Sequence, residues 1–117
     1  LVITPQDKRR FVEKLDFLTT PGYLTGKNAR EQAGLPAYSG PYKVITNLAV
    51  LGFNEKTCRM QIESVHPGIS VEQIKNNTGF ELLEAPKIVE TLPPTEEELK
   101  ILREKIDPDR YLIGREV

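Results

Sequence analysis

The hydrophobic and polar positions of this chain predict a small sheet with short helices beside it. Residues 42–53 are apolar on both faces of an extended chain, which is typical of a central strand covered on both sides. Residues 58–65 instead alternate apolar and polar side chains, as in a half-exposed strand. Because the turn-forming residues 54–56 join the two segments, we predict an antiparallel hairpin.

The N-terminal segment is predicted to form a short helix. Thr4 can cap it, and Pro5 suits the first helical position. Phe11 and Leu15 then recur at helical spacing. Residues 16–20 have strand-like composition, so we expect a short strand there, ended by a Pro-Gly pair.

A capping box marks the start of a further helix. Ser70 with Gln73 has the spacing at which the two side chains cap each other's backbone amides. This helix should run to about residue 77, and short strands are expected over residues 80–83 and 87–89.

A second capping box, Thr95 with Glu98, predicts the last helix, which Pro108 should stop. Its apolar side chains share one face: Leu99, Leu102 and Ile106. Between the N-terminal segment and the predicted hairpin, residues 23–40 are rich in glycine, proline and polar residues. We expect a long loop there, with one helical turn near residues 29–33.

Composition narrows the class of protein. The chain has 117 residues, 38% apolar and 28% charged, with a formal net charge of −1, which suits one globular domain with no partner among nucleic acids or membranes. The single cysteine excludes an internal disulfide and fits the cytoplasm. Because the chain starts at Leu1, we expect a processed or truncated product.

Candidate chemistry is sparse. One cysteine and one histidine are too few for the usual metal-ligand sets, so we expect no metal site. His66 precedes Pro-Gly at a strand-to-helix corner, where a structural hydrogen bond explains it better than general-base catalysis. Cys58 is expected to be a small strand residue, and Asn47 a buried residue with hydrogen-bond partners.

Four segments, in order, resemble the β subunits of glutaconate CoA-transferase-like proteins, a class I CoA-transferase family. They are residues 10–23, residues 42–50, residues 64–72 with 77–82, and residues 93–108. The resemblance implies an α/β fold with a partial open mixed sheet and flanking helices, of the NagB/CoA-transferase type. It also implies that residues 1–117 form the C-terminal domain of a β subunit.

The same resemblance implies a function. Such enzymes transfer CoA between an acyl-CoA and a carboxylic acid through a glutamyl-CoA thioester, and they pair the β subunit with an α subunit. CoA is then a substrate, and no cofactor is expected. The glutamate lies in the N-terminal half of the subunit, so no catalytic residue is carried over and we expect this chain alone to be inactive. Two positions depart from the family: residues 37–41 replace a glycine run, and Asn47 stands where relatives often have aspartate.

Two other functions stay open. One is a relative that hydrolyses CoA thioesters without the glutamate. The other is a non-catalytic domain that only completes a partner's fold. The full open reading frame would discriminate between them.

The residues expected to bind substrate lie around the long loop: Tyr23, Ser39, Gly40 and Tyr42. Loops at strand ends often form the ligand crevice of an open α/β sheet, so these residues should lie near the acyl-CoA or subunit-facing edge. The alternative is a simple connecting loop. The doubly apolar segment, residues 44–53, should also leave apolar surface that a missing partner once covered, so we expect the fragment to self-associate as a homodimer.

Overall fold

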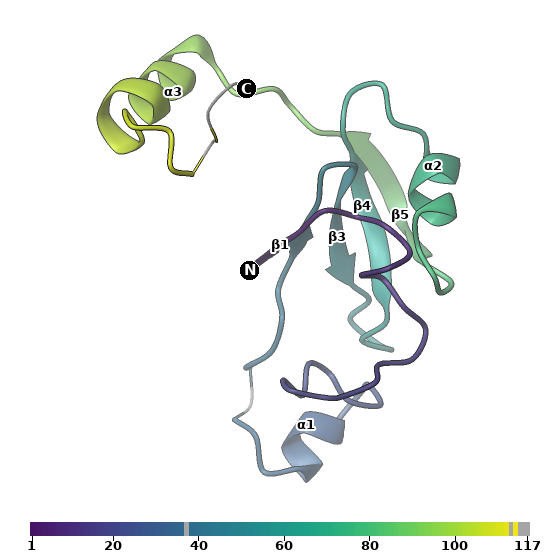
Figure 1. The fold of residues 1–117 in the computed structure, drawn as a ribbon. Coiled ribbons are helices and arrows are strands. Elements are labelled where there is room, and N and C mark those ends of the chain that lie inside the picture. The colour runs from purple at the N-terminus through teal and green to yellow at the C-terminus, as the bar shows by residue number, and fades with distance from the viewer. Residues whose placement is uncertain (37, 113, 115–117) are drawn as a thin grey trace.

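A computed structural model describes residues 1–36, 38–112 and 114. It contains an open mixed sheet with few helices (Figure 1), as expected. The five strands lie in chain order across the sheet: β1 (Val2–Ile3), β2 (Val44–Ile45), β3 (Ala49–Phe53), β4 (Met60–Val65) and β5 (Leu83–Glu90). The helices are α1 (Ala29–Gln32), α2 (Val71–Asn76) and α3 (Glu96–Ile101), which continues as a π-helical turn (Leu102–Ile106). The outer strand pairs are parallel and the inner pairs antiparallel.

The predicted hairpin is confirmed. Strands β3 and β4 pair antiparallel, with Leu51 opposite Ile62. The Asn54 side chain stabilises the turn, because its amide oxygen accepts from the backbone amides of Lys56 and Thr57, both at 3.0 Å. Local turn chemistry and alternation therefore suffice to predict this part of the sheet.

The expectation of one strand over residues 42–53 is wrong. The chain reverses after β2, and the buried Thr46 hydroxyl accepts from the backbone amides of Leu48 and Ala49 at 3.0 and 2.9 Å. The continuous apolar run therefore belongs to two antiparallel strands joined by a tight turn. Asn47 lies exposed in that turn and is not buried, although its side-chain oxygen accepts from the backbone amide of Gln6 at 2.8 Å.

The predicted N-terminal helix is absent. Only one turn forms, in which the carbonyl of Asp7 accepts from the backbone amide of Phe11 at 2.9 Å. The carbonyl of Phe11 is then bonded by the backbone amide of Gly79 at 2.7 Å, so it is not free to continue a helix. A Cβ at Gly79 would lie 2.5 Å from that oxygen, and only glycine permits the approach. Residues 16–20 also form no strand.

Both capping boxes are confirmed, at Ser70 with Gln73 and at Thr95 with Glu98. Helix α2 connects the parallel strands β4 and β5 and buries its Ile74. The two short strands expected after it are one strand, β5, whose pairing with β4 shifts midway. Strand β5 is at the edge of the sheet, where Pro86 is tolerated because no further strand needs its missing amide.

The core lies between the sheet and α2. Its buried apolar side chains come from the N-terminal segment, from β2 to β4, from α2 and from the residue before β5: Phe11, Val44, Ala49, Leu51, Ile62, Ile74 and Leu82. The rings of Phe11 and Phe80 stack with centroids 6.4 Å apart. This packing fixes the N-terminal segment across the sheet.

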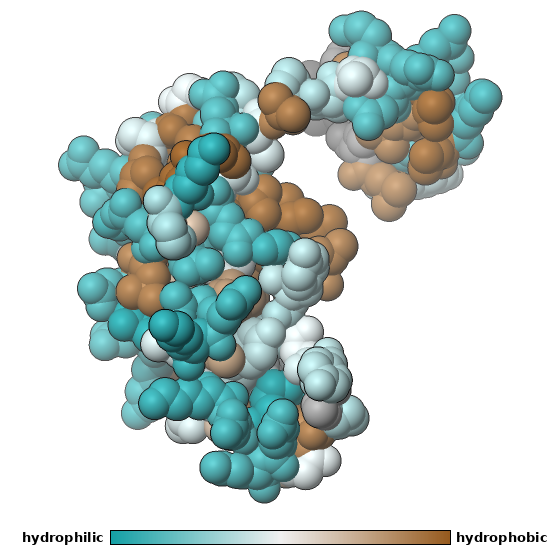
Figure 2. Space-filling view, turned by 180° about the vertical axis from the view of Figure 1, so that it is seen from behind, coloured by the Kyte–Doolittle hydropathy of each residue, from teal (hydrophilic) through white to brown (hydrophobic). Residues whose placement is uncertain are grey.

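The C-terminal helix stands apart from the sheet, at the end of the extended residues 91–95 (Figure 1). Part of its apolar face is uncovered, since Ile106 is 62% exposed. Hydrophobic side chains lie on both sides of the hollow between this helix and the rest of the molecule (Figure 2). In the part of the chain that the structure describes, no helix combines the length and the apolarity needed to cross a membrane.

Candidate functional site

Three of the four residues expected at the site meet at the base of the long loop. The Tyr23 hydroxyl donates to the carbonyl oxygen of Pro41 at 2.8 Å. Its ring packs on Phe53 of β3, with centroids 5.0 Å apart and an interplanar angle of 59°. Gly40 lies against the same ring, and Ser39 precedes it. The two ends of the loop are therefore joined through Tyr23.

Gly40 needs to be glycine for two reasons. Its φ is +139°, a conformation that other residues rarely adopt. A Cβ there would lie 3.0 Å from the Tyr23 ring. The turn before β2 therefore depends on the close contact between Gly40 and the Tyr23 ring. Ala37 of the same loop lies outside the described residues.

Tyr42 is not part of this cluster. Its side chain is 70% exposed, and the Lys43 ammonium lies 4.8 Å from the centre of its ring. Lys43 also pairs with Glu63 of β4. Tyr42 therefore follows the turn but lies on the open surface of the molecule.

Arg30 of α1 belongs to the cluster and was missed in the sequence. Its Nη2 donates to the Ser39 hydroxyl at 2.7 Å, and its Nη1 donates to the carbonyl of Gly22. Its Nε is buried with no partner among the described residues. The only signal in the sequence was one arginine in a predicted helical turn, which does not reveal which atoms it reaches.

A small pocket of about 360 Å³ opens beside this cluster. Its lining is mostly polar and combines charges of both signs with three hydroxyls and a thiol: Tyr23, Lys27, Arg30, Glu31, Pro36, Tyr38, Ser39, Glu55 and Cys58. Two of the predicted site residues, Tyr23 and Ser39, are among these. The loop thus encloses a polar space that neither Gly40 nor Tyr42 lines.

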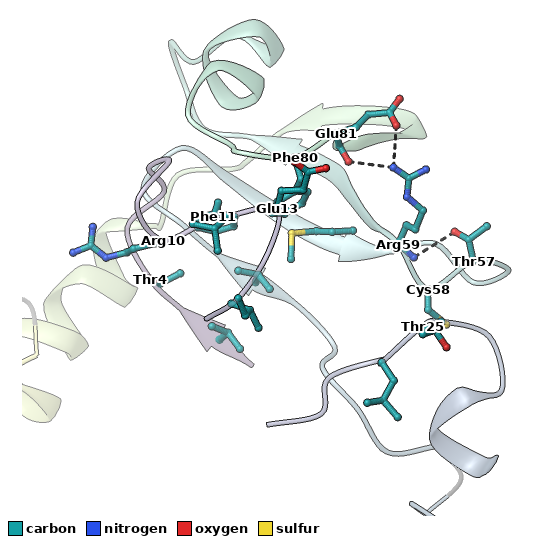
Figure 3. A pocket seen from close by; sticks show the side chains of 17 residues that line it. Thr4, Arg10, Phe11, Glu13, Thr25, Thr57, Cys58, Arg59, Phe80 and Glu81 are labelled. Carbon is teal, nitrogen blue, oxygen red and sulfur yellow. Dashed lines mark hydrogen bonds and ion pairs between the residues drawn. The ribbon is translucent and has the colours of Figure 1, made fainter. Parts of the chain in front are cut away.

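A larger groove of about 1070 Å³ lies across the sheet (Figure 3). Apolar side chains from the strands and the N-terminal segment line it, including Val44, Met60 and Phe80. Arg59 borders it and pairs with Glu81 at 3.0 Å. This mix of an apolar lining with a few charged groups is common in small-molecule sites, which span roughly 300–1,000 Å³.

Cys58 lines both cavities. It lies just before β4, in a left-handed conformation with φ +56°, so it is not the strand residue that was expected. Its thiol is half-buried and free. Beside it, Gly26 packs against the backbone of Thr57, which brings the long loop onto the tip of the hairpin.

His66 has the structural role that was expected. Its Nε2 lies 2.8 Å from the carbonyl oxygen of Thr46, and its Nδ1 lies 2.5 Å from the Thr91 hydroxyl. Because a carbonyl oxygen only accepts, Nε2 carries a proton. The ring therefore connects the turn before β3 to the end of β5. Among the described residues, no group of three or more His, Cys, Asp or Glu could hold a metal ion.

The sequence and the fold both match proteins of known family. The family model for coenzyme A transferase matches residues 1–77. The chain is 40% identical over 113 residues to the glutaconate CoA-transferase B subunit of Acidaminococcus fermentans, covering 97% of this chain and 42% of that protein. It is 34% identical over 113 residues to the cholesterol ring-cleaving hydrolase IpdB subunit of Rhodococcus jostii, covering 93% of this chain and 42% of that protein.

Solved structures agree. The crystal structure of glutaconate coenzyme A-transferase from Acidaminococcus fermentans matches with a TM-score of 0.87 and 39% identity, covering 97% of this chain and 44% of that one. Rhodococcus jostii IpdAB matches with a TM-score of 0.75 and 28% identity, covering 94% and 43%. The molecule thus has the mixed open sheet of these enzymes. The chain belongs to the coenzyme A transferase family, and it spans less than half the length of the relatives it matches.

Proposed function

We propose that residues 1–117 are the C-terminal domain of the β subunit of a CoA-transferase. The complete protein would pair with an α subunit and transfer CoA between an acyl-CoA and a carboxylic acid. The observation that carries this proposal is the 40% identity to a glutaconate CoA-transferase B subunit over 97% of the chain. The TM-score of 0.87 to the same enzyme supports it.

In this proposal the nucleophile lies outside the chain. A glutamate carboxylate attacks the thioester carbonyl and forms an anhydride, which releases the CoA thiolate. The thiolate then attacks the glutamyl carbonyl, so the enzyme holds CoA as a thioester and the first acid leaves. The second acid reverses these steps. CoA is a substrate throughout, and the scheme needs no cofactor.

The part that this chain plays is to hold the CoA ester. We assign substrate contact to the turn formed by Ser39 and Gly40, together with Tyr23 beneath it and Tyr42 after it. Support comes from the clustering of the first three residues beside a polar pocket. The exposed ring of Tyr42 would lie at the rim of the same surface.

A hydrolase related to the IpdB subunits is the second candidate, and a non-catalytic interaction domain is the third. Both identity and TM-score are lower for the hydrolase than for the transferase. The transferase therefore has the better support.

The test uses the complete β subunit purified with its α subunit. Acetyl-CoA and a set of isotope-labelled dicarboxylic acids are supplied, and both the new CoA ester and the free thiol are measured. Exchange without net release of thiol is expected. Thiol release without exchange would establish the hydrolase instead, and neither reaction would favour the interaction domain.

The same complex tests the site. Ser39→Ala and Tyr42→Phe should each raise the KM for the CoA ester. If both variants keep the wild-type kinetic constants, these two residues have a structural role and do not bind the substrate.

We further infer a cytoplasmic location, which the single free cysteine supports. We also infer that the isolated chain forms a symmetric homodimer. Val44, Ala49 and Leu51 of the segment expected to be uncovered are buried, and the exposed apolar surface that supports a dimer includes Ile101 and Ile106 instead. Light scattering at micromolar concentration measures this directly, and a clean monomer would contradict it.

A further inference from the structure

The long loop is closed at its base. The side chain of Tyr23 reaches across to Pro41, and Gly40 packs on the same ring. A loop tied at both ends can present a turn in one conformation, which lowers the entropy lost when a ligand binds. What keeps the loop in this shape is therefore relevant to ligand binding.

Arg30 is the residue that spans the loop. Its guanidinium donates to Gly22 at one end and to Ser39 at the other. A guanidinium is a rigid planar fork of donors, so two bonds to separate acceptors fix their spacing in a way that the flexible lysine ammonium does not. These bonds are also charge-assisted on the donor side, which makes them stronger than bonds between neutral groups.

The contact with Arg30 also decides what the Ser39 hydroxyl can do. That oxygen accepts from Arg30, and its own proton is donated to the carbonyl of Pro36. A hydroxyl has one proton to donate, so none is left for a ligand. Ser39 therefore holds the turn in place, and its contact with a substrate does not include donating a hydrogen bond.

We propose that Arg30 is a positioning residue, which acts through Ser39 and Gly22 to hold the turn at Gly40 in the conformation that binds the CoA ester. The inference rests on the proposed function. It goes beyond that function because it gives a side chain on α1, which contacts Ser39 and Gly22, a role in fixing the binding geometry.

The experiment measures the Kd for free CoA, which has no acyl group to transfer to the enzyme, by calorimetry, together with kcat and the KM for acetyl-CoA, in the complete two-subunit protein. Arg30→Gln should raise both Kd and KM about tenfold, the change expected for roughly one lost charge-assisted hydrogen bond. The kcat should stay within about threefold, because the reacting groups are elsewhere. Arg30→Lys should give an intermediate rise and covers the case in which Arg30→Gln does not fold. The matched control is Arg9→Gln, because Arg9 is an exposed arginine in the N-terminal turn. This control should change neither the Kd nor the KM.

A double-mutant cycle separates positioning from general destabilisation. If Arg30 acts through Ser39, then Ser39→Ala should add little to the effect of Arg30→Gln on Kd. Two results would overturn this inference and leave the proposed function intact. In the first, the fold-changes in Kd from Ser39→Ala and Arg30→Gln multiply fully in the double variant. In the second, the wild type binds and neither Arg30 variant changes the Kd. A wild-type complex that neither binds CoA nor exchanges it between acids would overturn the proposed function and the inference with it.

Discussion

Replacing Gly26 with alanine tests how the long loop is held on the hairpin. Gly26 is buried and has φ +89°. An added Cβ would lie 2.4 Å from the carbonyl oxygen of Thr57. Because that atom belongs to the backbone, no rotamer change can relieve the overlap. The substitution must move either the loop or the hairpin tip.

Two effects add to the expected loss of stability at Gly26. A left-handed conformation costs an L-residue about 1–2 kcal/mol. Overpacking against fixed atoms typically costs a further 1–3 kcal/mol or so. We therefore expect Gly26→Ala to reduce the free energy of unfolding by about 3 kcal/mol, a large part of the roughly 5–15 kcal/mol of a typical domain.

The assay is equilibrium unfolding in urea followed by far-ultraviolet circular dichroism. Gly34→Ala is the matched control, because Gly34 has φ +76° but no atom within 4 Å of an added Cβ. Gly34→Ala should reduce the free energy of unfolding only by the cost of the left-handed conformation, about 1 kcal/mol. Equal losses for the two variants would refute the close contact between Gly26 and Thr57.

Three further outcomes are expected. Leu51→Asp should unfold the chain because Leu51 is fully buried, whereas Val50→Asp, at a half-buried position, should shift the thermal midpoint less; equal shifts would contradict the assignment of the core. The backbone amide and then the hydroxyl of Thr95 hold the pKa of Glu98 below its ordinary value of 4.5. This cap is therefore present above pH 4.5 and lost as the pH falls through the lowered pKa. The protection of the α3 amides, meaning their exchange rate relative to the intrinsic rate at the same pH, should therefore decrease on acidification, and protection that does not depend on pH would count against this cap. The isolated chain should show no CoA exchange between acetyl-CoA and dicarboxylic acids, and turnover near an ordinary enzymatic rate of about 1 per second would contradict this.

The features that the sequence predicted correctly are those decided by neighbouring residues. The capping box at Ser70 needs only a partner three residues on, and the turn at Asn54 needs only its own amide oxygen. The N-terminal helix failed because a distant residue, Gly79, takes the carbonyl of Phe11. Nothing near Phe11 in the sequence carries that information.

The candidate site, too, was predicted only where neighbouring residues decide the structure. Composition singled out the loop, and the structure brings Tyr23 and Gly40 of that loop together. The role of Arg30 depends on the path of the chain on either side of α1, which no spacing reveals. Thr46 was missed as a turn residue because it lies inside an apolar run.

We propose that this chain is part of a CoA-transferase but does not supply its nucleophile. The most direct measurement incubates the complete two-subunit protein with acetyl-CoA alone, digests it and locates the CoA-modified peptide by mass spectrometry. We expect a glutamyl-CoA thioester in a peptide outside residues 1–117. A CoA thioester on any carboxylate within residues 1–117 would contradict it.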